Sequence, residues 1–268
     1  MGEIIQDRDY LLNQQYRQPD GLQARMFLHR AYGTNADSWT KWVYDQMNLA
    51  DGMFVLELGC GTGALWQEQG KRLPADCRLV LSDLSPGMLA TARGNVAHMP
   101  QAVFYRGDAG CLPFDDGMFD MVAAHYMLYH VSDLPATLQE MRRVMRPGGW
   151  LCAATNGIAH MRELHDLLVE SGNLPEQVPA VKANDSARLF GLESGIVPLR
   201  VTFARVERVD FTQHLQVRDV QPMMDYIYSM WGHDLPHEDE LRRRIQAEID
   251  RQGFFFIGKS QGMLKAQR

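Results

Sequence analysis

The stretch Met53–Gly63, MFVLELGCGTG, decides the fold of this chain. Its first six residues form a nearly continuous apolar run, which is typical of a strand buried on both faces. The glycines that follow allow a tight turn and let a ligand approach the backbone closely. A short helix is expected at 64–72, and its first turn offers unpaired N–H groups. The stretch therefore predicts a strand, a turn and a helix, with a ligand bound at the turn.

Short apolar runs and helical segments alternate from there to residue 155. Ser85 before Pro86 is typical of a helix N-cap, and the helix is expected to run to Ala97. Ser132 is the predicted N-cap of the next helix. Such alternation indicates an α/β fold, a doubly wound parallel sheet with right-handed crossovers. Further strands are expected at 78–82, 102–106, 119–124 and 150–154.

Composition excludes several classes of protein. The chain has 268 residues, 33 acidic against 27 basic, and 46% apolar residues, which is typical of a globular protein without a basic surface for nucleic acid. No apolar run reaches 18 residues, so no membrane span is expected, and the reducing cytoplasm is the expected location. The four cysteines form no CxxC, and we expect His160 and His165 on the surface rather than at a metal.

A ligand of such a sheet binds at the carboxyl ends of the strands. The residues there are Gly59–Gly63, Asp83, Asp108, His125 and Asn156. Gly59, Gly61 and Ala64 fit the dinucleotide pattern GxGxxG/A, with Asp83 at a suitable distance for a ribose. A nicotinamide-dependent oxidoreductase is therefore one interpretation.

The order of motifs resembles the class I S-adenosylmethionine-dependent methyltransferases of small-molecule type. The resemblance covers residues 53–155 and implies a Rossmann-like, mostly parallel seven-stranded sheet with S-adenosyl-L-methionine as the cofactor. It rests on ELGCGTG, the acid in LVLSDLSPGML, and then GDAGCLPF, FDMVAAHYMLYHV and RPGGW.

The resemblance also implies one domain over residues 1–268, with the last two strands paired as an antiparallel edge. The expected domain divides into a helical lid at 1–50, a cofactor-binding core at 51–155, cap elements at 156–200 and 219–250, and the last two strands at 201–218 and 251–268.

The same resemblance assigns roles in cofactor binding. Asp83 would accept from two ribose hydroxyls, and its alternative is a helix cap or loop carboxylate. Asp108 would accept from the adenine amino group while the Ala109 N–H donates to the ring; the alternative for Asp108 is a turn residue. Met88 would pack on adenine or serve as plain core. Gly59 and Gly61 would line the amino-acid tail, Glu57 would orient the loop or the tail's ammonium, and Gly63 would serve close helix–strand packing. The other predicted cofactor-binding residues are Cys60, Leu84 and His125.

Methyl transfer requires alignment of donor and acceptor and exclusion of water. His125 is the candidate base, because histidine titrates near neutrality; alternatively it bonds backbone or the cofactor tail. Tyr32 would close over the sulfonium, since a cation favours a ring face, or would pack at a helix end. We predict methylation of a small-molecule acceptor without metal, nucleic acid or membrane, by a monomer or homodimer. A non-catalytic cofactor-binding protein is the other alternative.

Overall fold

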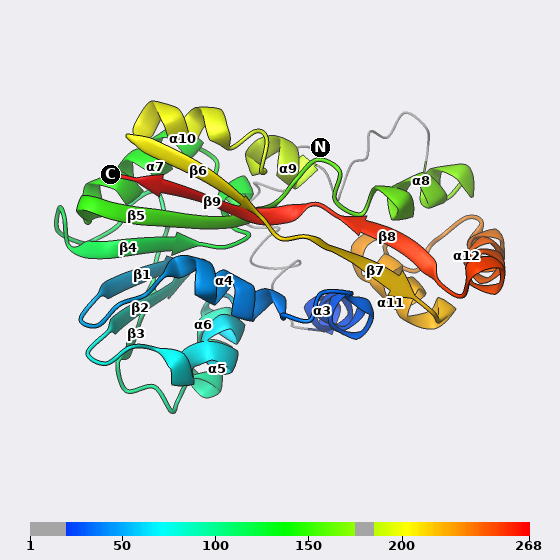
Figure 1. The fold of residues 1–268 in the computed structure, drawn as a ribbon, viewed down its shortest axis with the longest axis horizontal. Coiled ribbons are helices and arrows are strands. Elements are labelled where there is room, and N and C mark those ends of the chain that lie inside the picture. Colours follow the sequence, from blue (N-terminus) through cyan, green and yellow to red (C-terminus); the bar gives the residue numbers. More distant parts are fainter. Residues whose placement is uncertain (1–19, 175–184) are drawn as a thin grey trace.

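A seven-stranded sheet forms the larger lobe of the computed structural model, which describes residues 20–174 and 185–268 (Figure 1). Its order is β3-β2-β1-β4-β5-β9-β6; the first five strands are parallel, and β9 runs antiparallel to β5 and β6. This confirms the predicted doubly wound, mostly parallel sheet. The strands are β1 Phe54–Leu58, β2 Arg78–Asp83, β3 Ala102–Arg106, β4 Phe119–Ala124, β5 Met145–Asn156, β6 Arg205–Asp210 and β9 Gln261–Gln267.

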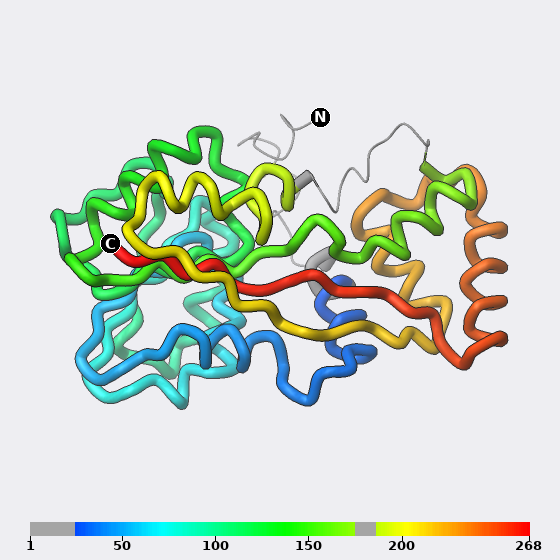
Figure 2. Tube along the Cα trace, turned by 45° about the horizontal axis from the view of Figure 1, so that its top comes forward, coloured from blue at the N-terminus to red at the C-terminus, as the bar shows by residue number. Residues whose placement is uncertain are grey.

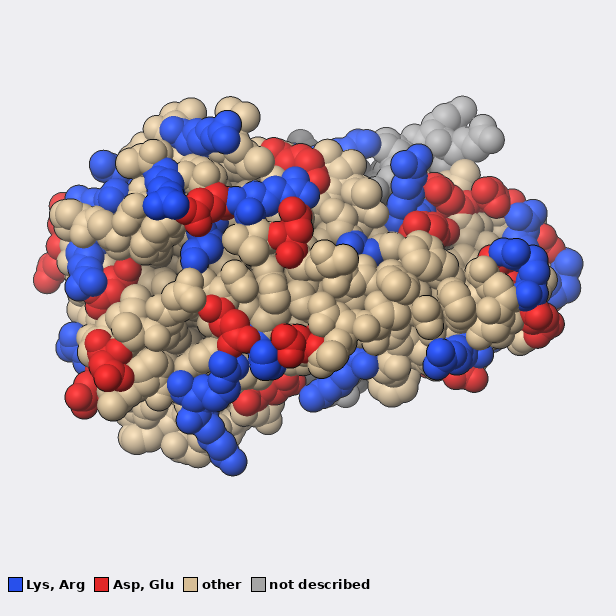
Figure 3. Space-filling view, in the orientation of Figure 1, with Lys and Arg blue, Asp and Glu red and all other residues tan. Residues whose placement is uncertain are grey.

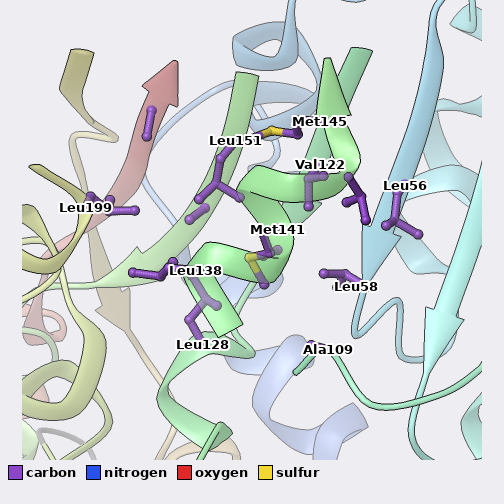
Figure 4. Packing of buried hydrophobic residues seen from close by; sticks show 14 of the residues in the cluster. Leu56, Leu58, Ala109, Val122, Leu128, Leu138, Met141, Met145, Leu151 and Leu199 are labelled. Atoms are coloured by element: carbon purple, nitrogen blue, oxygen red, sulfur yellow. The ribbon is translucent and has the colours of Figure 1, made fainter. Parts of the chain in front are cut away.

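Helices cover both faces of this sheet. Alternate residues of β1 serve opposite faces: Leu56 and Leu58 belong to one apolar cluster and Val55 to the other. Figure 4 shows Leu138 and Met141 of α7 against the first face. Full burial of such a side chain contributes roughly 1.5–3 kcal/mol. The first face is covered by α7 (Leu134–Val144), α9 (Asp185–Phe190) and α10 (Ile196–Thr202), the second by α4 (Trp39–Met47), α5 (Ala64–Gln69) and α6 (Pro86–Asn95).

A smaller helical lobe extends the molecule beyond the carboxyl ends of the parallel strands (Figures 1 and 2). It has its own apolar cluster, which includes Leu28, Leu168, Leu215 and Ile227. The chain passes into it directly from β5. Its elements are α3 (Asp20–Tyr32), α8 (Arg162–Glu170), α11 (Val220–Trp231), α12 (Glu238–Gln252) and the antiparallel pair β7 (Gln213–Val217) and β8 (Phe255–Lys259).

The two C-terminal segments predicted as single strands are each divided between the lobes. β6 and β9 complete the sheet, whereas β7 and β8 pair with each other in the helical lobe. Between β6 and β7, the ring of Phe211 packs against the rings of Trp39 and Trp42. One long antiparallel ribbon thus ties the lobes together.

Three expectations on boundaries need correction. Residues 185–202 belong to the sheet lobe rather than to a cap, because Phe190 and Leu199 are buried against the first face of the sheet. The lid is also split, since α3 packs on α11 whereas α4 packs on α5; residues 1–19 lie outside the described residues. The N-cap of α7 is Asp133 rather than Ser132, because the Asp133 carboxylate accepts from Ala136 N at 3.0 Å.

Candidate active site

The glycine turn after β1 has a left-handed backbone. Gly59, Gly61 and Gly63 have φ of 69°, 55° and 71°, a region that favours glycine. A Cβ on Gly59 would lie 2.8 Å from the Met127 Cβ, so Gly59 also permits a close contact. A Cβ on Gly61 would meet nothing within 4 Å. The turn therefore has open space beside Gly61, as a ligand approaching the backbone requires.

Asp83 ends β2 beside this turn. One carboxylate oxygen accepts from Gly61 N at 2.9 Å, and the other accepts from Ser85 N at 2.8 Å. Burial raises the pKa of Asp83, although these backbone hydrogen bonds oppose the rise. Each oxygen keeps a second lone pair for a hydroxyl donor. The loop-carboxylate interpretation and the ribose interpretation are thus compatible.

Glu57 lies in β1, two residues before Gly59, and its side chain is buried. Its Oε2 accepts from Trp66 Nε1 of α5 at 2.5 Å. Burial raises the pKa of Glu57 to about 7, the indole hydrogen bond lowers it, and the nearby Asp83 charge raises it. Glu57 therefore ties β1 to the helix that follows the turn.

The remaining predicted cofactor residues occupy different environments. Asp108 is exposed, and its carboxylate accepts from Gly110 N at 2.9 Å. This hydrogen bond is the one expected if Asp108 is a turn residue. Ala109 and Met88 are buried, and Leu84 is half-buried. The Cys60 side chain packs in the core of the second face, where burial raises the pKa of its thiol. Only the backbone of Cys60 is placed to line the turn.

His125 follows β4 and carries a buried polar atom without a partner. Its Nδ1 accepts from Ala154 N at 3.3 Å, while its Nε2 is buried and has no hydrogen bond. Because Nδ1 accepts, the proton of the neutral ring is on Nε2. Burial lowers the pKa of His125 to about 4. This geometry argues against the predicted general base and makes Nε2–H a hydrogen-bond donor.

Aromatic side chains stand next to His125, between the lobes. Tyr126 has a left-handed backbone with φ of 56°, and its N–H donates to Ala154 O at 2.8 Å. Its ring lies 5.6 Å from the ring of Trp39, which lies 5.4 Å from Phe211. The Asn156 side-chain oxygen, at the end of β5, is buried without a partner. The ends of β4 and β5 therefore offer planar surfaces together with unsatisfied polar atoms.

Tyr32, the predicted lid residue, has a partner within the helical lobe. Its hydroxyl donates to Asp219 Oδ2 at 2.7 Å, just before α11. Burial and this hydrogen bond raise the pKa of Tyr32 to about 12. The ring packs at the edge of the helical lobe's apolar cluster. These contacts favour the packing interpretation over closure on the sulfonium.

Sequence reasoning missed a group of basic side chains at the junction of the lobes. His160, expected on the surface, is only 5% exposed, and its Nδ1 lies 3.1 Å from Ser260 O. Its ring centroid is 6.1 Å from that of His29 on α3. The charge of Lys259, at the end of β8, lowers the pKa of both histidine rings. These residues are far apart in the sequence, so no spacing pattern signals them.

The outer surface carries mixed charge. Figure 3 shows basic and acidic side chains interspersed over both lobes on the visible face. On α12, Arg242 pairs with Glu238 at 2.8 Å and Arg244 with Glu240 at 2.6 Å, as expected for a solvated helix face. None of the described helices is both long and apolar enough to cross a membrane. Within residues 20–174 and 185–268, no three His, Cys, Asp or Glu side chains gather as a metal site.

The part of the chain that contains the glycine turn, Asp83 and His125 is similar to known proteins. Residues 55–149 match a family described as "Methyltransferase domain". The 2-phytyl-1,4-naphtoquinone methyltransferase of Thermosynechococcus vestitus is 36% identical over 111 residues, 41% of this chain and 49% of that protein. The ubiquinone/menaquinone biosynthesis C-methyltransferase UbiE of Idiomarina loihiensis is 30% identical over 154 residues, 55% of this chain and 61% of that protein. The chain thus spans less than two thirds of each relative's length.

A solved structure extends the likeness to both lobes. The phosphoethanolamine N-methyltransferase 2 of Haemonchus contortus, in complex with S-adenosyl-L-methionine, superposes with a TM-score of 0.61 at 17% identity. The superposition covers 97% of this chain and 59% of that one. At this identity the likeness establishes the fold.

Proposed function

Because the chain belongs to the class I S-adenosylmethionine-dependent methyltransferase family, we propose that it transfers the methyl group of that cofactor to a small-molecule acceptor by in-line displacement. The observation that carries the proposal is the Asp83 carboxylate, fixed by the amides of Gly61 and Ser85 beside an open glycine turn. When bound, S-adenosylmethionine supplies a methyl group activated by a sulfonium.

The residues of the site fit this cofactor. Asp83 has lone pairs for the ribose hydroxyls, and the amides of the glycine turn suit the carboxylate of the tail. Glu57, which accepts from Trp66 Nε1, would attract the ammonium of the tail. The expected adenine contacts are Met88, Asp108 and the Ala109 N–H, which stay predictions from the resemblance.

The acceptor would enter between the lobes, next to His125. Trp39 and Tyr126 provide ring faces for a planar molecule. A planar acceptor agrees with the names of the two relatives, a naphthoquinone methyltransferase and a C-methyltransferase of ubiquinone and menaquinone biosynthesis. The side chains of His125 and Tyr126 are buried, and exclusion of water there would favour the displacement.

His125 would act as a donor rather than as a base. Its Nε2–H is free to bond an oxygen of the acceptor or the tail carboxylate of the cofactor. A methyl transfer to a carbanion, an amine or an ionised oxygen needs no protein base once donor and acceptor are aligned. A cytoplasmic location and a monomeric or homodimeric state stay predictions from the sequence.

The test is a calorimetric titration of the protein with S-adenosylhomocysteine, with NAD as the parallel ligand. We expect micromolar affinity for the first and none for the second. The Asp83→Ala variant serves as the site control. Binding of NAD alone would replace the proposal with the oxidoreductase alternative. Cofactor binding without methyl transfer to any planar acceptor would favour the non-catalytic alternative.

A further inference from the structure

The basic cluster at the junction of the lobes is formed by His29, His160 and Lys259. They come from three elements: α3, the turn between β5 and α8, and the end of β8. Tyr226 of α11 closes one side, with its ring edge-on to His29 at 5.7 Å. Because the chain crosses between the lobes at residues 156–161 and 259–261, the cluster lies where the lobes join (Figure 1).

The cluster lacks acidic partners. Among the described residues, no carboxylate forms an ion pair with its three members. The nearby carboxylates are already bonded: Glu163 accepts from Gly258 N at 2.8 Å, and Glu193 accepts from Ile158 N and pairs with Arg208. A lysine ammonium without a carboxylate partner, beside two imidazoles that an anion would help to protonate, attracts an anion.

The surroundings place this group inside the protein and yet within reach of a ligand. Burial lowers the pKa of Lys259 to about 7 and that of His160 to about 3, and the Lys259 charge lowers the latter further. Lys259 and His29 are half-buried rather than fully enclosed, and the Nδ1 atom of His29 is buried without a hydrogen-bond partner. The backbone joins the cluster to the end of β5 on the acceptor side, because Ser260 O, which contacts His160, also accepts from Gly157 N at 2.9 Å.

We propose that Lys259, with His29 and His160 beside it, binds a carboxylate of the methyl acceptor, which makes the substrate a small organic acid. This inference rests on the proposed function. The carboxylate would supply the missing counter-charge, and the protonated forms of all three side chains would gain stability in its presence. A neutral acceptor would leave these nitrogen atoms uncompensated.

The experiment compares benzoate with benzamide, which has the same ring and shape but no charge. Each is titrated calorimetrically into the protein at pH 6.5 and pH 8.5, with and without saturating S-adenosylhomocysteine. We expect at least tenfold tighter binding of benzoate at pH 6.5. The preference should weaken at pH 8.5, because Lys259 has then lost its proton.

Variants assign the effect to one side chain. Lys259→Met should abolish the preference for benzoate, and Lys259→Arg should keep it at both pH values. Lys265→Met is the matched control, because Lys265 has similar exposure and its Nζ donates to Gln46 O at 2.9 Å, outside the cluster. It should bind like the native protein.

The results separate this inference from the proposed function. Equal binding of benzoate and benzamide, no detectable benzoate binding, or an unchanged preference in folded Lys259→Met would overturn the carboxylate site. Loss of S-adenosylhomocysteine binding with an intact benzoate preference would overturn the proposed function alone. An intact fold in each variant is established by its thermal transition.

Discussion

The Asp83 carboxylate accepts a hydrogen bond from the Gly61 amide at 2.9 Å, so the end of β2 holds the glycine turn that follows β1. The two residues meet because β1 and β2 are parallel neighbours whose carboxyl ends coincide, with Leu58 opposite Ser82. The same carboxylate is the acceptor that we predict for the ribose hydroxyls. If the ribose assignment is correct, turn geometry and cofactor recognition depend on one side chain.

Replacement of Asp83 by alanine should weaken cofactor binding far more than folding. Two hydrogen bonds from ribose to a charged acceptor contribute about 3–6 kcal/mol together, so at least roughly a 100-fold loss of affinity for S-adenosylhomocysteine is expected. Calorimetry measures the affinity, and urea unfolding measures the stability. The exposed Asp115→Ala variant is the control. Unchanged affinity in folded Asp83→Ala would remove the ribose assignment.

Glu57 makes stability depend on pH. Its pKa is raised from 4.5 to about 7, so between these values the folded protein keeps a proton that the unfolded chain has released. Stability is therefore full below pH 4.5 and falls as the pH rises to about 7, by up to about 3 kcal/mol.

The Glu57→Gln variant removes this titration and keeps an acceptor for Trp66 Nε1. It should be more stable than the native protein at pH 8 and similar at pH 4.5, as measured by thermal unfolding. Its affinity for S-adenosylhomocysteine should fall, because the ammonium of the tail loses a charged partner. If the stability of Glu57→Gln at pH 8 is no higher than that of the native protein, ionisation of Glu57 does not destabilise the fold, and the raised pKa is contradicted.

His125 should behave as a hydrogen-bond donor. Its pKa near 4 keeps it neutral throughout pH 5.5–9, so the pH–rate profile should show no inflection from this ring. His125→Ala should lower turnover about fivefold, since one hydrogen bond contributes about 1 kcal/mol, and His125→Gln should restore part of it. His98→Gln on the surface is the control. An inflection near pH 6.5 that disappears in His125→Gln would reinstate the general base.

Whether Tyr32 closes over the sulfonium can be tested by comparing the binding of charged S-adenosylmethionine and uncharged S-adenosylhomocysteine. Tyr32→Phe loses the hydrogen bond to Asp219 and should cost about 0.5–1.5 kcal/mol of stability without an effect on cofactor binding. Tyr32→Ala should then bind S-adenosylmethionine and the uncharged S-adenosylhomocysteine with unchanged relative affinity. A selective loss of the sulfonium compound would instead support closure of Tyr32 over it.

Buried histidines should make the protein sensitive to acid. Burial holds the pKa of His125 near 4 and that of His160 near 3, whereas the unfolded chain protonates these rings near 6.5. Because the unfolded state binds more protons at these rings in this window, the contribution of the two histidines to stability should fall as the pH drops from 6.5 to about 4, opposite in sign to the contribution of Glu57. Urea unfolding at pH 7 and pH 5 measures the loss, which His160→Gln should reduce. An equal loss in that variant would contradict the assignment.

Local sequence determined the sheet and the cofactor side of the site. The strands and helices of residues 53–156 follow from apolar runs, caps and glycines, and each signal lies within a few residues of the element that it specifies. Gly61 and Asp83 fall at the carboxyl ends of β1 and β2, because parallel strands end on the same edge. The prediction of Ser132 as a cap failed since Asp133, one residue later, is an equally good acceptor.

Only the tertiary structure decided what stands opposite the cofactor residues. His29, His160 and Lys259 come from three distant segments, and their proximity follows from the packing of α3 on α11 and from the ribbon that joins the lobes. The tautomer of His125 depends on the Ala154 amide of a neighbouring strand. A residue's burial and charge partners are set by contacts between distant segments, and these contacts leave no periodic signal in the chain.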